Sequence, residues 1–236
     1  MTSVDQFTLG ISNAFFLKGD QVVLVDTGSE GGAEAFQRVC EEHGVKPSEI
    51  TLIVITHGHA DHFINASEIK ELTGAPILCH KAAQDILREG REPFIVPRND
   101  LGRRVYEDTM RNPPTGSIPP VEADILIDEP CSLRAYGVDA RIILTPGHSD
   151  CSLSVLLDTG EAIVGDLVLA DHFSKKLALA WFANDEKKLF DSIETVLDGA
   201  TIIYSGHGGP YSSEEVRALL RREQGEVVDL GSTPGP

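Results

Sequence analysis

Three histidines and an aspartate lie within six residues of the chain, in the segment His57-Gly58-His59-Ala60-Asp61-His62. Neutral imidazole and carboxylate groups are the usual protein ligands of zinc and related divalent ions. Alternate residues of an extended or tightly turned segment can converge on one point, so His57 and His59 suit a single ion. Asp61 and His62 are offset in register and reach more naturally toward a second ion. The spacing therefore predicts a metal site with two neighbouring ions.

An apolar run, Leu52-Ile53-Val54-Ile55, precedes this segment. The run is short, continuous and rich in β-branched residues, which predicts a buried strand. Functional sites of α/β folds lie at the carboxyl ends of such strands. A lone histidine in a polar turn is usually solvated, but three of the chain's eight histidines are gathered here. The cluster therefore favours metal binding over a solvated turn.

The pattern His-x-His-x-Asp-His after an apolar strand resembles the signature of the metallo-β-lactamase fold superfamily. Four other segments are similar to the rest of that signature and occur in its order along the chain: Asp26-Thr27-Gly28, Thr145-Pro146-Gly147-His148-Ser149, Gly165-Asp166 and Gly206-His207-Gly208. The resemblance extends over about residues 10 to 210. It implies an α/β fold, a four-layer αββα sandwich of the metallo-β-lactamase type.

The resemblance also implies roles for seven side chains. The first ion would be bound by His57, His59 and His148, the second by Asp61, His62 and His207, and Asp166 would bridge the two. We expect two divalent ions, with Zn2+ ahead of Fe or Mn. Two such ions can hold a bridging hydroxide at neutral pH and polarise the attacked carbonyl. Asp61 is the candidate catalytic residue, since it could position this nucleophile or pass a proton to the leaving group.

The resemblance favours a metal-dependent hydrolase that cleaves a small thioester, lactone or related acyl substrate. The chain ends soon after His207, without the C-terminal helical region with which glyoxalase II holds glutathione, so that activity is not expected. β-Lactamase action is not expected either, because no export signal is found and residue 61 is Asp. Two alternatives stay open: a mononuclear iron persulfide dioxygenase, and a non-catalytic metal-containing protein that binds a ligand or signals.

The composition narrows the range of partners. The chain has 37 acidic and 20 basic residues, giving a formal net charge of −17. Binding to nucleic acid or anionic membranes depends on clustered Lys and Arg, so neither partner is expected. We find no signal peptide and no apolar run near the ~20 residues that span a bilayer. Four scattered cysteines fit a reducing cytoplasm, and a small-molecule substrate is the expected partner, while the oligomeric state stays open.

We expect a single domain over residues 1–224 and a flexible C-terminal tail over residues 225–236. Residues 89–120 contain six prolines and little periodicity, which predicts an insertion: a lid, a short helical insert or a mobile segment. Surface solvation is the expectation for three arginines of this insertion, Arg98, Arg103 and Arg104.

Short apolar runs separated by turn residues predict strands in the second half of the chain. A meander is expected from residues 123–127, 133–138 and 141–144, and a hairpin from residues 152–157 and 162–164.

Three further polar residues lie outside the implied ligand set. Asp26, at a strand end, is predicted either to bond backbone amides or to orient a ligating histidine, and the resemblance favours the second role. His80 and His172 match no ligand position, so we assign them no metal role.

Overall fold

The computed structural model describes residues 1–111, 117–171 and 173–225. The part of the predicted tail that follows residue 225 lies outside the described residues, and so does His172. Within the described ranges, no helix combines the length and the apolar character needed to cross a bilayer.

One six-stranded sheet is built from the first half of the chain, in the order β1-β2-β3-β4-β5-β6. The strands are Ser3–Leu9 (β1), Ser12–Lys18 (β2), Val22–Val25 (β3), Ile50–Val54 (β4), Ile77–His80 (β5) and Ile125–Ile127 (β6). The first three pair antiparallel, and β3 to β6 pair parallel. Parallel pairing brings the carboxyl ends of β3, β4 and β5 to the same edge of the sheet.

A second six-stranded sheet has the order β14-β13-β10-β9-β8-β7. Its strands are Cys131–Ser132 (β7), Ala140–Leu144 (β8), Leu153–Leu157 (β9), Glu161–Ile163 (β10), Ile202–Tyr204 (β13) and Tyr211–Ser212 (β14). A separate antiparallel pair is formed by Val168–Ala170 (β11) and Leu177–Leu179 (β12).

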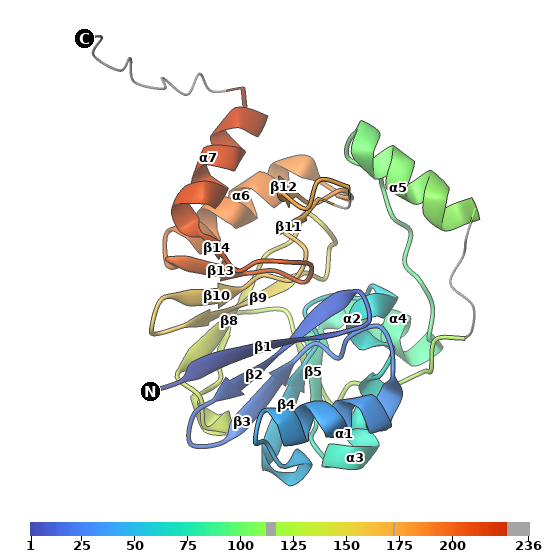
Figure 1. Ribbon diagram of the computed structural model, residues 1–236, viewed down its shortest axis with the longest axis vertical. Helices are drawn as coiled ribbons and strands as arrows, with labels where there is room; N and C mark the ends of the chain where they lie inside the picture. Colours follow the sequence, from blue (N-terminus) through green and yellow to red (C-terminus); the bar gives the residue numbers. More distant parts are fainter. Residues whose placement is uncertain (112–116, 172, 226–236) are drawn as a thin grey trace.

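Helices cover the outer face of each sheet (Figure 1). The α-helices are Gly32–Glu42 (α1), Ala60–Phe63 (α2), Ala66–Thr73 (α3), Gln84–Glu89 (α4), Asp100–Arg111 (α5), Glu186–Leu197 (α6) and Ser213–Glu223 (α7). Short 3-10 turns are formed by Pro47–Glu49 (η1), Lys81–Ala83 (η2) and Arg134–Tyr136 (η3). A capping box in which Ser212 and Glu215 bond each other's backbone amides starts α7, as the sequence predicts.

Three apolar clusters separate the layers. Side chains alternate along β2, so Phe15 packs between the two sheets while Phe16 packs against Phe36 of α1. On the other side of the molecule, Ile203 of the second sheet packs with Ile193 of α6 and Val216 of α7. The order is therefore helices, sheet, sheet, helices, and the predicted four-layer αββα sandwich is confirmed.

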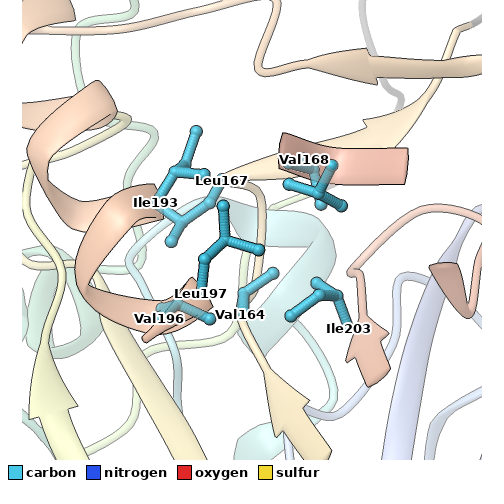
Figure 2. Close-up of a pocket in the computed structure, with 8 residues that line it drawn as sticks. Val164, Leu167, Val168, Ile193, Val196, Leu197 and Ile203 are labelled. Atoms are coloured by element: carbon cyan, nitrogen blue, oxygen red, sulfur yellow. The ribbon is translucent and has the colours of Figure 1, made fainter. Parts of the chain in front are cut away.

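The layer beneath α6 and α7 is tightly filled. Figure 2 shows a cavity of about 10 Å³ there, with Val164, Val168 and Ile203 on one side and Ile193 and Leu197 of α6 on the other. A space of this size with an apolar lining barely admits a water molecule and offers it no hydrogen bonds. The helices α6 and α7 therefore pack closely against the second sheet.

The predicted meander is wrong. Strand β6 joins β5 in the first sheet, whereas β7 and β8 belong to the second. Most of the expected strand over residues 133–138 is instead the turn η3, which ends at Gly137 with a positive φ of 82°. Short apolar runs show that a segment is buried, but the pairing partner is set by distant residues.

The predicted insertion over residues 89–120 contains the helix α5. Figure 1 shows α5 at the edge of the molecule. The chain just before α5 is anchored by an antiparallel bridge between Pro97 and Phe182. Gly102 of α5 lies so close to this anchor that a Cβ there would be 2.2 Å from the Trp181 carbonyl oxygen.

Candidate metal centre

Four strand ends supply the seven side chains singled out in the sequence. The segment 57–62 follows β4, His148 follows β8, Asp166 follows β10 and His207 follows β13. These segments lie far apart in the chain, yet the structure brings their side chains together in two adjoining groups.

The local backbone explains why residues 57–62 divide between the groups. His59 is extended, with φ −81° and ψ 141°, and α2 begins at the next residue. His57 and His59 therefore project from an extended segment, whereas Asp61 and His62 project from the first helical turn. The change of backbone conformation sends the two pairs to different points, as the register offset predicts.

The first group contains His57, His59, His148 and Asp166. Nδ1 of His59 lies 3.1 Å from Nε2 of His57 and 3.0 Å from Nε2 of His148. Ligands held about 2.0–2.1 Å from a tetrahedral ion are separated by about 3.3 Å, so these nitrogens are spaced as a zinc-type site requires. Oδ2 of Asp166 is 4.0 Å from Nε2 of both His57 and His148.

The second group contains Asp61, His62 and His207. Oδ2 of Asp61 lies 3.1 Å from Nε2 of His207 and 3.7 Å from Nε2 of His62. Asp166 also borders this group, because its Oδ2 is 3.4 Å from Nε2 of His207 and its Oδ1 is 3.4 Å from Nε2 of His62. One carboxylate thus faces both groups.

Two buried polar atoms in the centre make no hydrogen bond, although they face each other at an ion-pair distance of 3.4 Å. Nε2 of His62 and Oδ1 of Asp166 are shielded from solvent and make no hydrogen bond within the described residues. Buried polar atoms normally have a partner, and both of these atoms are good metal donors. The residues present therefore fit a bound divalent cation.

Three histidines are oriented through their Nδ1 atoms. Nδ1 of His62 lies 2.8 Å from Asp26 Oδ2, Nδ1 of His148 lies 2.9 Å from the Phe182 carbonyl oxygen, and Nδ1 of His207 lies 2.9 Å from the Ile11 carbonyl oxygen. A carboxylate or carbonyl oxygen can only accept, so each Nδ1 donates its proton. Each Nε2 is consequently directed at the centre, where it can bind a metal once it carries no proton.

Asp26 fulfils both roles that the sequence left open. Its Oδ1 accepts from the Thr56 amide at 2.7 Å, and its Oδ2 accepts from the Thr56 hydroxyl at 2.7 Å and from His62. The residue is fully buried and has a positive φ of 59°, a conformation that favours glycine. Its hydrogen bonds hold this backbone in place and fix the ring of His62.

Glycine is required where β13 passes the centre. A Cβ on Gly206 would lie 2.3 Å from Oδ1 of Asp166 and 2.6 Å from Cε1 of His62. On the opposite side, a Cβ on Gly165 would lie 2.9 Å from the Thr56 hydroxyl oxygen. The backbone therefore approaches the candidate ligands too closely for any side chain.

The electrostatics differ between the two groups. Burial, followed by the neighbouring imidazoles, lowers the pKa of His57 well below its usual range and that of His59 to about 3, and burial also lowers the pKa of His148. In the second group burial opposes charge, but Asp166 and Asp61 raise the pKa of His207 to about 10. The same carboxylates and Asp26 raise the pKa of His62.

The pKa values of the two carboxylates, Asp61 and Asp166, are lowered instead of raised. Burial works against ionisation, yet His62 and His207 hold the pKa of Asp61 and of Asp166 below the usual range. Without an ion, protons on the second-group imidazoles thus balance the two carboxylates. A bound cation would supply the same positive charge.

His80, which was given no metal role, belongs to neither ligand group. Nδ1 of His80 accepts from the Ala82 amide at the start of η2.

The sequence analysis missed some groups that orient the candidate ligands. The carbonyls of Ile11 and Phe182 are backbone groups, which every residue type carries, so the sequence does not single them out. Glu92 was also missed: burial and the charge of Asp61 raise its pKa to about 7.

Comparisons with known proteins bear on the family of this chain. The sequence-family model described as the metallo-beta-lactamase superfamily matches residues 7–207. A probable metallo-hydrolase of Methanocaldococcus jannaschii is 30% identical over 159 residues, covering 67% of this chain and 68% of the relative. A probable metallo-hydrolase of Bacillus subtilis is 28% identical over 247 residues, covering 92% of this chain and 72% of the relative.

Solved structures share the fold. The crystal structure of the B3 metallo-beta-lactamase BLEG-1 is 20% identical and superimposes with a TM-score of 0.68 over 92% of this chain and 97% of that one. A protein crystallised in a di-iron-bound form is also 20% identical, with a TM-score of 0.68 over 91% of this chain and 98% of that one. At this identity the likeness concerns the fold alone.

Proposed function

The chain belongs to the metallo-beta-lactamase superfamily, and from that premise we propose that it is a metal-dependent hydrolase that cleaves a small thioester, lactone or related acyl compound. The observation that carries the proposal is the pair of ligand groups that share Asp166. In this assignment His57, His59 and His148 hold one divalent ion, Asp61, His62 and His207 hold another, and Asp166 contacts both.

The protein contributes orientation and a proton carrier. Two bound divalent ions would lower the pKa of a shared water toward about 7 and polarise the carbonyl under attack. The side chain of Asp61 is 26% exposed, so its carboxylate can reach a substrate. The Ser12 hydroxyl donates to the main-chain carbonyl of Asp61 and fixes that residue. Asp61 can then orient the attacking water or carry a proton to the leaving alkoxide or thiolate.

The donor set favours zinc, with iron or manganese as alternatives, because five imidazoles and two carboxylates suit borderline divalent ions. The second group also supports a two-ion centre over the mononuclear iron dioxygenase alternative. Its three side chains converge as a further ligand set, and Nε2 of His62 makes no hydrogen bond within the described residues.

Exposed apolar side chains on two segments near the centre support an acyl substrate. Ile11, whose carbonyl holds His207, is 69% exposed. Phe94 of the insertion is 83% exposed and follows Glu92 by two residues, a carboxyl whose pKa is raised by burial and in part by the charge of Asp61. An apolar group bound near the ions would cover these side chains.

The proposal includes a cytoplasmic location and a small-molecule partner, with neither nucleic acid nor membrane as a partner. The net charge of −17 supports the last of these statements, since anionic polymers and lipids bind to clustered basic residues.

Elemental analysis of protein purified without added metal, combined with hydrolysis of thioester, lactone and phosphoester panels before and after chelation, tests the proposal. We expect two zinc-type ions per chain and acyl hydrolysis that is lost with chelator. His148→Ala should remove the activity, whereas His80→Ala, a histidine outside the centre, should retain it. One iron per chain with oxygen consumption would favour the dioxygenase, and tight metabolite binding without turnover would favour a non-catalytic protein.

A further inference from the structure

A short segment, residues 180–183, lies against both ligand groups. The Phe182 carbonyl oxygen accepts the Nδ1 proton of His148, a first-group residue, at 2.9 Å. The ring of the preceding residue, Trp181, stacks on His207, a second-group residue, with centroids 6.4 Å apart and planes inclined by 26°. Adjacent residues therefore contact one candidate ligand of each ion.

The other edge of this segment pairs with the insertion. The Arg98 amide donates to the Trp181 carbonyl at 2.9 Å, and the Ala183 amide donates to the Val96 carbonyl at 2.9 Å. The bridge between Pro97 and Phe182 lies between these two bonds. The segment is thus held between the metal centre and the insertion.

The side chain of Arg98 fastens this pairing. It is only 6% exposed, so the expectation of surface solvation is wrong for this arginine. Its Nε donates to the Ala180 carbonyl at 2.9 Å, and its guanidinium pairs with Glu186 of α6 at 2.9 Å and Glu223 of α7 at 3.0 Å. One planar guanidinium thus joins the insertion to segment 180–183 and to the helices α6 and α7. The single ammonium group of a lysine lacks this planar set of donors.

We propose that Arg98 is a positioning residue for the metal centre: it holds segment 180–183 so that Phe182 orients His148 and Trp181 packs on His207. The inference rests on the ligand assignment of the proposed function. Arg98 contacts neither ion nor substrate, and it acts only through the backbone it fixes.

The expected effect is larger at the first ion. Loss of a hydrogen-bonded partner behind a ligating histidine typically weakens metal binding 10–100-fold. Because Arg98 acts one step behind the Phe182 carbonyl, we expect Arg98→Ala to weaken zinc binding by about tenfold, the lower end of that range. The second ion, which depends on ring stacking at His207, should be affected less.

The test is a zinc titration against a competing chelator, followed by elemental analysis and by tryptophan emission. Trp181 is the sole tryptophan of the chain, so its emission reports on the ring beside His207. Arg103→Ala is the matched control, because Arg103 belongs to the same insertion, is 60% exposed and pairs with Asp100, three residues away in the chain. Arg98→Lys tests the geometry of the guanidinium and should restore binding in part.

Weaker zinc binding and altered emission in Arg98→Ala, with Arg103→Ala like the parent, would support the proposal. Equal affinity in Arg98→Ala and the parent would overturn it and leave the ligand assignment standing. If the parent itself bound no zinc, the ligand assignment would fail and the inference with it. Should Arg98→Ala not fold, the double variant Glu186→Gln/Glu223→Gln removes both ion pairs of Arg98, and the same two affinity outcomes decide.

Discussion

Nδ1 of His62 lies 2.8 Å from Oδ2 of Asp26, and both side chains are fully buried. This contact decides which nitrogen of His62 carries the proton, so Nε2 is left to face Asp166 and Asp61. The second ligand group therefore depends on a residue that does not belong to it.

Replacing Asp26 by asparagine should selectively weaken the second ion. An amide NH2 facing Nδ1 of His62 would force the proton onto Nε2 and block the candidate ligand atom. We expect a 10–100-fold loss of affinity for the second ion. Equilibrium dialysis should therefore give a metal content closer to one ion per chain than to two. Asp5→Asn, which alters a carboxylate paired with Lys18 away from the centre, is the control. Two tightly held ions in Asp26→Asn would contradict the orienting role.

Replacing Gly206 by alanine should disturb both groups at once. The new Cβ would collide with Asp166 and His62, and crowding of this kind costs about 1–3 kcal/mol of unfolding free energy. Gly44→Ala provides the comparison, because that glycine has a φ of 64° but open space around its Cβ. It should lose only about 1 kcal/mol of stability from backbone strain and keep its full metal content. Urea unfolding and elemental analysis measure the two effects, and unchanged metal content in Gly206→Ala would count against the close approach.

Binding of the second ion should release protons at pH 7.5. The pKa of His207 is raised to about 10 and that of His62 is also raised, so these rings carry protons that an ion must displace. Affinity for this ion should therefore increase as the pH rises toward 10, by up to about tenfold per unit for each proton displaced. The first group should release no imidazole protons, because the pKa values of its histidines are lowered. Calorimetry in buffers of different ionisation enthalpy counts the protons, and zero release with both ions would refute the charge balance described here.

Much of the centre could be predicted from the sequence because its chemistry is local. The apolar run before Thr56 and the spacing of residues 57–62 indicate a ligand-bearing strand end without knowledge of the fold. The match of Asp26, His148 and His207 to a known signature then placed the distant residues. Their convergence is a property of the three-dimensional structure, and it agrees with that expectation.

The features that were missed depend on pairing between distant segments. Strand β6 pairs with β5, some 47 residues earlier in the chain, and its own sequence does not reveal that partner. The carbonyls of Ile11 and Phe182 are backbone groups, so no residue type signals their contacts with His207 and His148. The sequence predicts an exposed Arg98, because its ion-pair partners Glu186 and Glu223 are distant in the chain and no neighbouring residue points to them.

Anomalous X-ray diffraction from crystals of the zinc-loaded protein, with data collected on both sides of the zinc absorption edge, tests the central claim most directly. We predict two peaks about 3.5–4 Å apart. One should lie among His57, His59 and His148, the other among Asp61, His62 and His207, and Asp166 should contact both. A single peak, or peaks away from these side chains, would contradict a centre in which seven residues hold two ions.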